Sequence, residues 1–225
     1  MKYAGLLMLF LMGVGKIFAQ PVDTKDYNLL LYNSNRRLNE IAYEDIQGHP
    51  YSSEEMQPGT IRFISGFQSD SVPMRYNWYT HTMEVKPEDE LLALVHSTDI
   101  VWVEIDGVRY IPFFNLKSVE GYLIELYKGG LSLFREDDVL FIDEQPAQSG
   151  YEEPKPAKFQ WRNPVYRAIL SDGTVIKLEQ NKRKLPAQFP RHASKIAAHI
   201  KEQKLNPKKE EDLIAIIEFA DGLGQ

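Results

Sequence analysis

Short runs of β-branched and aromatic residues alternate with turn residues between Thr60 and Asp143. Such runs at close spacing are typical of short strands joined by tight turns. Because tight turns connect antiparallel neighbours, the pattern predicts an antiparallel meander that forms a rolled sheet, a sandwich or a barrel-like fold. The expected strands are 61–64, 74–79, 82–85, 91–95, 100–105, 108–114, 122–127, 131–134 and 139–142.

The dipeptide Asp106-Gly107 lies between two of these runs and predicts a two-residue hairpin turn. This turn needs positive φ at both central positions, which Asp and Gly tolerate. Both faces of the hairpin are apolar away from the turn, so we expect it to be covered on both sides and Trp102 to lie in the core. The register set by the turn pairs Ile105 with Val108, Glu104 with Arg109, Val103 with Tyr110 and Trp102 with Ile111.

The pattern changes after the meander. Residues 145–157 hold three prolines and no apolar period, which predicts a linker or a surface arm. Residues 159–161 and 165–170 are expected strands, and Asp172-Gly173 is expected to turn the chain into a third strand.

Helical spacing follows towards the C-terminus. Ile196 and Ile200 lie four residues apart within 191–204, and Asn206-Pro207 suits the start of a second helix. The second helix should end near Gly222. Its apolar stripe, which predicts packing on the sheet, consists of Leu213, Ile216, Ile217 and Ala220. The expected fold class is therefore α+β, an antiparallel meander with a C-terminal helical hairpin.

The N-terminus has the features of a secretory signal. A basic start is followed by an apolar run from Ala4 to Val14 and by Phe18-Ala19-Gln20. The run is shorter than the ~20 residues of a membrane-spanning helix. We therefore expect residues 1–19 to be a cleaved signal peptide, and the mature protein from Gln20 to be periplasmic or extracellular and not integral to the membrane. Residues 20–58 show no decisive pattern.

Charge is divided unevenly along the chain. The whole chain has 26 basic and 32 acidic residues. Residues 20–154 carry 10 basic and 24 acidic side chains, whereas residues 155–225 carry 14 basic and 8 acidic ones. We expect an acidic strand-rich domain over 20–144 and a basic hairpin with two helices over 158–225. The two parts are free to pack as one domain or to face different partners.

Several kinds of chemistry lack their sequence signatures. The chain has no cysteine, so thiolate chemistry and iron–sulfur clusters are excluded. It also has no HExxH, GxSxG, P-loop or GxGxxG motif. An exported acidic protein is a poor candidate for binding nucleic acid. We expect no cofactor, no metal site and no catalytic residue.

Two groups of residues are candidate binding surfaces. Aromatic rings beside Arg and Asn can stack on a sugar or a peptide and donate hydrogen bonds to it, while a basic cluster can contact an acidic partner. The alternative is that the aromatic group is a core strand. The candidates are Arg75, Tyr76, Asn77, Trp78 and Tyr79 in the first group, and Lys182, Arg183 and Lys184 in the second.

Short motifs along the mature chain carry a resemblance. They are Gly48-His49-Pro50-Tyr51, Pro58-Gly59-Thr60-Ile61, Pro73-Met74-Arg75-Tyr76-Asn77, Met83-Glu84-Val85 and Glu210-Glu211-Asp212-Leu213. With these motifs, and with Phe18-Ala19-Gln20 at the end of its signal, the chain resembles a family of exported Bacteroidetes proteins of unknown function. The resemblance covers most of the mature chain and assigns no catalytic or binding residue.

Three functions remain open at this point. The favoured one is an exported, non-catalytic envelope or surface protein that binds a protein or a glycan. The second is a hydrolase whose carboxylates meet only in the fold, within ~5–10 Å of each other in a cleft. The third is a carrier of an apolar ligand, which requires an apolar cavity of ~300 Å³ or more.

Overall fold

The computed structural model describes residues 46–87, 91–94, 98–115, 118–147 and 153–224. The predicted signal peptide, residues 1–19, and the segment 20–45 lie outside the described residues. The strands are β1 (Gln57–Phe63), β2 (Val72–Asn77), β3 (Thr82–Val85), β4 (Leu92–Leu94), β5 (Ile100–Ile105), β6 (Val108–Asn115), β7 (Ser118–Tyr127), β8 (Leu131–Glu136), β9 (Val139–Ile142), β10 (Lys158–Trp161), β11 (Val165–Leu170) and β12 (Val175–Lys177). The helices are α2 (Lys184–Ala187), α3 (Ala193–Glu202) and α4 (Glu210–Gly222).

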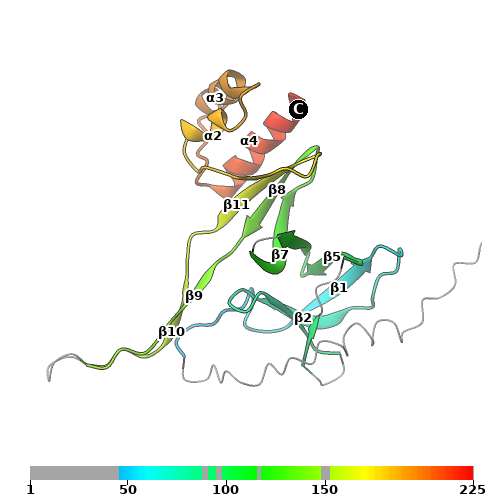
Figure 1. The fold of residues 1–225 in the computed structure, drawn as a ribbon, viewed down its shortest axis with the longest axis vertical. Coiled ribbons are helices and arrows are strands. Elements are labelled where there is room, and N and C mark those ends of the chain that lie inside the picture. The colour runs from blue at the N-terminus through cyan, green and yellow to red at the C-terminus, as the bar shows by residue number, and fades with distance from the viewer. Residues whose placement is uncertain (1–45, 88–90, 95–97, 116–117, 148–152, 225) are drawn as a thin grey trace, which may run out of the picture.

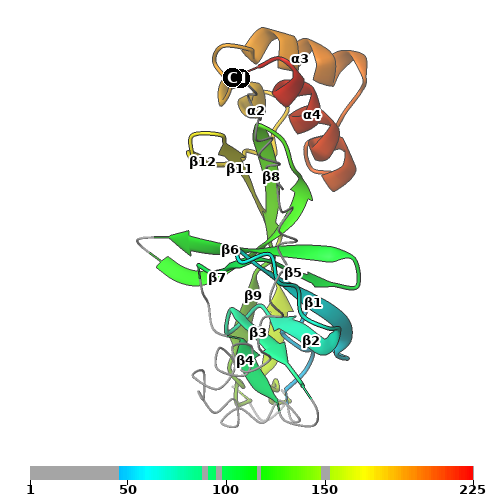
Figure 2. The same cartoon turned by 90° about the vertical axis from the view of Figure 1, so that its right-hand side faces the viewer.

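Ten of these strands form one antiparallel sheet in the order β12-β11-β8-β7-β6-β5-β1-β2-β3-β4, and β9 pairs with β10 in a separate ribbon. The sheet stays open rather than closing into a barrel. The predicted α+β class, a meander with C-terminal helices, is confirmed. The helices lie at one end of the molecule and β1 to β3 at the other, with the long central strands between them (Figures 1 and 2).

The β5–β6 hairpin has the predicted register. Asp106 and Gly107 have φ values of 48° and 77°, and Val103, Glu104 and Ile105 pair with Tyr110, Arg109 and Val108. One difference appears at the far end of β5. A register shift against β1 between Arg62 and Phe63 places Ile100 in the core at 5% exposure and leaves Val101 at 39%. Strict alternation would place Val101 on the same buried face as Val103, and the bulge reverses that.

The inner face of the sheet carries two apolar cores. The first joins β1, β2, β3, β5, β6 and β7 to the β9–β10 ribbon, and the second joins β8 and β11 to the helices. The α4 stripe lies in the second core as predicted, with Leu213, Ile216 and Ile217 at 0% exposure and Ala220 at 5%. Half-buried Leu126 packs against both cores.

Two further expectations can be compared with the structure. The described ends of the predicted linker or arm, 145–147 and 153–157, continue the β9–β10 ribbon through paired Gln145 and Lys155, and Figure 1 shows this ribbon projecting from the body. Helix α4 begins at Glu210, later than predicted. The Asn206 side chain instead forms a turn before the helix, because its Oδ1 accepts a hydrogen bond from the Lys208 backbone amide at 3.2 Å.

Candidate functional site

The aromatic pair of the first candidate group lies inside the first core. Tyr76 is 0% exposed and Trp78 is 1% exposed. Their rings meet edge to face at 4.5 Å between centroids, and the Tyr76 hydroxyl accepts a hydrogen bond from the Tyr122 backbone amide at 3.0 Å. Burial raises the pKa of Tyr76 far above its ordinary value. Neither ring presents a face to solvent.

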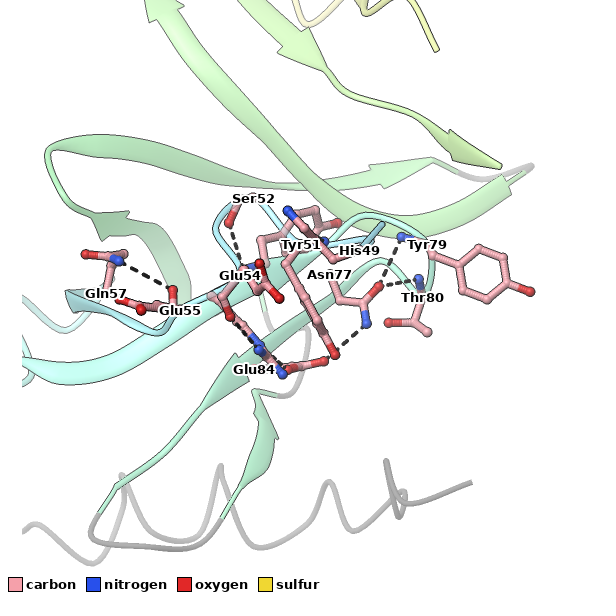
Figure 3. Close-up of polar contacts among 12 residues, drawn as sticks. His49, Tyr51, Ser52, Glu54, Glu55, Gln57, Asn77, Tyr79, Thr80 and Glu84 are labelled. Carbon is pink, nitrogen blue, oxygen red and sulfur yellow. Dashed lines mark hydrogen bonds and ion pairs between the residues drawn. The ribbon is translucent and has the colours of Figure 1, made fainter. Parts of the chain in front are cut away.

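Arg75 and Asn77 belong to a buried polar network centred on Glu84, which is 2% exposed. Arg75 Nε donates to Glu84 Oε2 at 2.7 Å and Asn77 Nδ2 donates to Glu84 Oε1 at 3.2 Å. The Arg75 guanidinium also lies 3.5 Å from the centroid of the Tyr51 ring. The Asn77 side-chain oxygen accepts hydrogen bonds from the backbone amides of Tyr79 and Thr80 in the β2–β3 turn, as Figure 3 shows. These contacts fix the turn, and sequence reasoning missed Glu84 as their centre.

The remaining candidates lie in different places. Tyr79 is 37% exposed, and its ring packs on Phe159 at 5.4 Å. Lys182, Arg183 and Lys184 are exposed at the start of α2, where Lys184 Nζ lies 3.8 Å from a Glu179 carboxylate oxygen. Because β2 and α2 lie at opposite ends of the molecule (Figure 1), the structure does not bring the two candidate groups together.

A different apolar surface lies on the other face of the sheet, which we call the outer face. The neighbours of its residues along each strand, such as Val103, Tyr110 and Ile124, point into the first core, so its own side chains point the opposite way. An exposed face of an antiparallel sheet is usually polar. Here it carries an apolar band that consists of Trp102, Ile111, Phe113, Leu123 and Phe134.

The apolar band is independent of both cores. Leu123 and Phe134 are 3% and 7% exposed but belong to neither core, while Trp102, Ile111 and Phe113 are half-buried. No helix of the described chain covers the band, because the α4 stripe packs in the second core on the inner face. Trp102 is half-buried and belongs to neither core, so the expectation that it lies in the core was wrong.

Arginine side chains lie over the aromatic rings of the band. The Arg109 guanidinium is 5.1 Å from the Trp102 ring centroid, and that of Arg167 is 5.8 Å from Phe113. Each arginine also has an acidic neighbour. Arg109 Nε donates to Glu104 Oε2 at 2.9 Å, and Arg167 Nε donates to Glu136 Oε2 at 2.8 Å. The charged groups flanking the band therefore largely satisfy one another.

A polar cleft of about 440 Å³ lies beside the tip of the β5–β6 hairpin. Glu104 and Glu125 contact the same Arg109 guanidinium, at 2.9 Å and 3.8 Å. On the other side of the cleft, Arg135 Nη1 donates hydrogen bonds to both carboxylate oxygens of Glu210, at 3.0 Å and 2.9 Å.

Two neighbours of this cluster have shifted pKa values. Burial raises the pKa of the Asp137 carboxyl, and the adjacent Arg135 opposes that shift. Burial, followed by the charge of Glu210 and the hydrogen bond to it, raises the pKa of Tyr166 to about 12. Carboxylates thus meet in this cleft, each beside an arginine.

The described residues hold no group of three His, Asp or Glu side chains able to bind a metal ion. None of the helices in this part of the chain is long and apolar enough to cross a membrane. Comparison of the chain with protein-family models, with curated protein sequences and with solved structures found no match. The resemblance to exported Bacteroidetes proteins therefore stays a prediction.

Proposed function

We propose that this chain is an exported, non-catalytic protein that binds a partner protein through the outer face of its sheet. The observation that carries the proposal is the apolar band of the outer face, in which Trp102, Ile111 and Phe113 are half-buried and arginine lies over the Trp102 and Phe113 rings. Tryptophan, aromatic residues and arginine are the side chains that dominate the binding energy of protein interfaces. Export rests on residues 1–19, and mass spectrometry of the mature protein from cells is expected to place its first residue at Gln20.

The chemistry of the outer face favours a protein partner over a glycan. A glycan site needs polar groups free to hydrogen-bond sugar hydroxyls, whereas the flanking charges here pair with each other. Half-buried, aliphatic Ile111 extends the band beyond its aromatic rings. A partner that covers this band gains most of its affinity from apolar burial.

One charged group points to the character of the partner. Arg62 lies directly across from Trp102 on β1 and has no ion pair with any residue in the described part of the chain. It is half-buried, so an unmatched positive charge at this position favours an acidic group on the partner. We infer a partner surface that is apolar at its centre and acidic at its rim.

The experiment captures partners from the envelope of the source organism with the mature protein and then measures binding of the purified partner. Arg62→Glu and Trp102→Ala are expected to weaken binding about tenfold or more, because hot-spot truncations commonly exceed that loss. Trp161→Ala is the matched control, since Trp161 is 42% exposed on β10 outside the outer face. A partner that binds all three variants as it binds the wild type contradicts the proposal.

The polar cleft makes a hydrolase the second candidate, because Glu104 and Glu125 converge on one guanidinium. Glycoside hydrolysis needs two carboxyl groups that flank the sugar, whereas these two both contact the Arg109 guanidinium. The outer face is therefore the better-supported site. Turnover of a glycoside substrate that is abolished by Glu125→Gln would reverse this ranking.

A further inference from the structure

A second cavity, which we call the C-terminal groove, lies beside the C-terminal helices. It has a volume of about 340 Å³ and lies between the β11–β12 hairpin, the segment that joins α2 to α3, and the end of α4. Its walls are mainly apolar, and include Leu170, Ile176, Phe189 and Pro190. A volume above ~300 Å³ is within the range of small-molecule sites.

Two polar side chains of the groove are already used by the fold. Gln188 Nε2 donates to the Lys177 carbonyl at 2.7 Å, and Gln188 Oε1 accepts from the Glu179 amide at 2.9 Å. Asp172 Oδ1 accepts from the Thr174 amide at 2.8 Å, and this hydrogen bond lowers the pKa of the carboxyl group. Both side chains hold the ends of β12 in place. The Gln188 amide is therefore not free to select a ligand, while Asp172 remains a charged carboxylate on the β11–β12 side of the groove.

The other two polar side chains are not used in this way. Arg191 is exposed and His192 half-buried, and neither side chain has a hydrogen bond or an ion pair within the described part of the chain. The Arg191 guanidinium is always charged and presents donors in a fork that matches a carboxylate. The groove thus combines an apolar wall with one carboxylate, Asp172, which is bonded to the Thr174 amide, and one free cationic fork, Arg191.

The C-terminal part of the chain also has more basic than acidic residues. Residues 155–225, which supply most of the groove, have 14 basic and 8 acidic side chains. The exposed cluster of Lys182, Arg183 and Lys184 lies just before the segment that lines the groove. Such a field attracts anions and opposes the binding of cations.

We propose that the C-terminal groove binds a small anionic amphiphile, an alkyl or aryl carboxylate. The apolar body lies against the side chains of Leu170, Ile176 and Phe189, and the carboxylate pairs with the Arg191 guanidinium. The volume suits one chain of medium length and excludes a multi-chain lipid. This site is separate from the outer face, so partner binding and ligand binding are independent properties of the protein.

The test is calorimetric titration of the folded mature protein with decanoate, decan-1-ol and decyltrimethylammonium. Decanoate is expected to bind most tightly and the ammonium compound most weakly. Arg191→Gln should weaken decanoate binding about tenfold or more, because hydrogen bonds to charged groups are strong, and should leave decanol binding unchanged. Arg183→Gln, which removes the same charge outside the groove, should leave both unchanged.

Ile176→Trp fills the groove and should abolish binding of decanoate and decanol alike, with circular dichroism confirming that the variant is folded. Mapping the protein's NMR chemical-shift changes on addition of decanoate locates the ligand without any substitution, and we expect the largest changes at residues 188–192. Equal affinity for decanoate and decanol, or an unaffected Arg191→Gln, overturns the assignment of the carboxylate. Absence of decanoate binding, or a map elsewhere on the molecule, overturns the site.

Discussion

Replacement of Glu84 by glutamine tests whether the Arg75–Glu84–Asn77 network stabilises the fold. The change keeps the size of the side chain and removes its charge. The Arg75 and Glu84 side chains are 18% and 3% exposed and their contact is 2.7 Å, so the pair is largely shielded from water. Breaking a fully buried pair costs about 3–5 kcal/mol. Because Arg75 keeps some solvent and its contact with Tyr51, we expect a loss of about 2–3 kcal/mol.

The assay is urea unfolding of the mature protein, followed by tryptophan fluorescence, with Trp78 in the first core as a reporter. The midpoint should fall while the dependence on urea stays unchanged, since the fold is the same. Glu104→Gln is the matched control, because Glu104 and Arg109 also pair across a hairpin, but with side chains 34% and 45% exposed. Its expected loss is about 0.5 kcal/mol or less. Equal losses for the two variants would refute the reasoning from burial.

Three other predictions follow from the packing and the titration of single side chains. Gly59→Ala should destabilise the protein by about 1–3 kcal/mol in the same assay, because the added Cβ would clash with the Met74 side chain. Ile216→Ala should cost about 3 kcal/mol, since Ile216 is 0% exposed, and half-buried Ile214→Ala should cost clearly less. Burial lowers the pKa of His81 below its ordinary value of 6.5, so the unfolded chain binds this proton more readily than the folded one. Stability should therefore fall as pH drops through that value towards the lowered pKa. His81→Asn should reduce this slope between about pH 7.5 and about pH 5, and an unchanged slope would contradict the assignment.

The parts of the fold that depend on local pattern were predictable. The Asp106-Gly107 turn fixed the β5–β6 register, because two residues with positive φ allow one pairing of the flanking strands. Likewise, the stripe from Leu213 to Ala220 has the spacing of one helix face, and that face is buried. Each signal lies within a few residues of the structure that it specifies.

Features that depend on distant pairing were not predictable. The pairing of β1 with β5 and of β8 with β11 joins strands far apart in sequence, and no local pattern specifies it. The bulge that exposes Val101 arises from the first of these pairings. Because both faces of the hairpin are apolar, Trp102 was expected to be buried. The local sequence, however, does not specify which face of the sheet packs against a helix or another strand.

The Glu84 network was predictable only in part. Both strands were expected, but the expected bounds, 74–79 and 82–85, leave two residues for the turn and would pair Glu84 with Asn77. In the structure β2 ends at Asn77, so the turn has four residues and Arg75 pairs with Glu84, where cross-strand charges interact. The aromatic residues of β2 drew attention to a ligand surface, although burial in the first core was the stronger reason for their presence.

The most direct test of the outer face is photo-crosslinking in living cells of the source organism. A benzoylphenylalanine at position 111, in the apolar band, is compared with one at position 140, where Leu140 is 44% exposed on β9 outside that face. We expect a discrete protein adduct from position 111, lost when Arg62→Glu is added, and no such adduct from position 140. The same adducts from both positions, or none from position 111 while the protein is folded and exported, would contradict partner binding through the outer face.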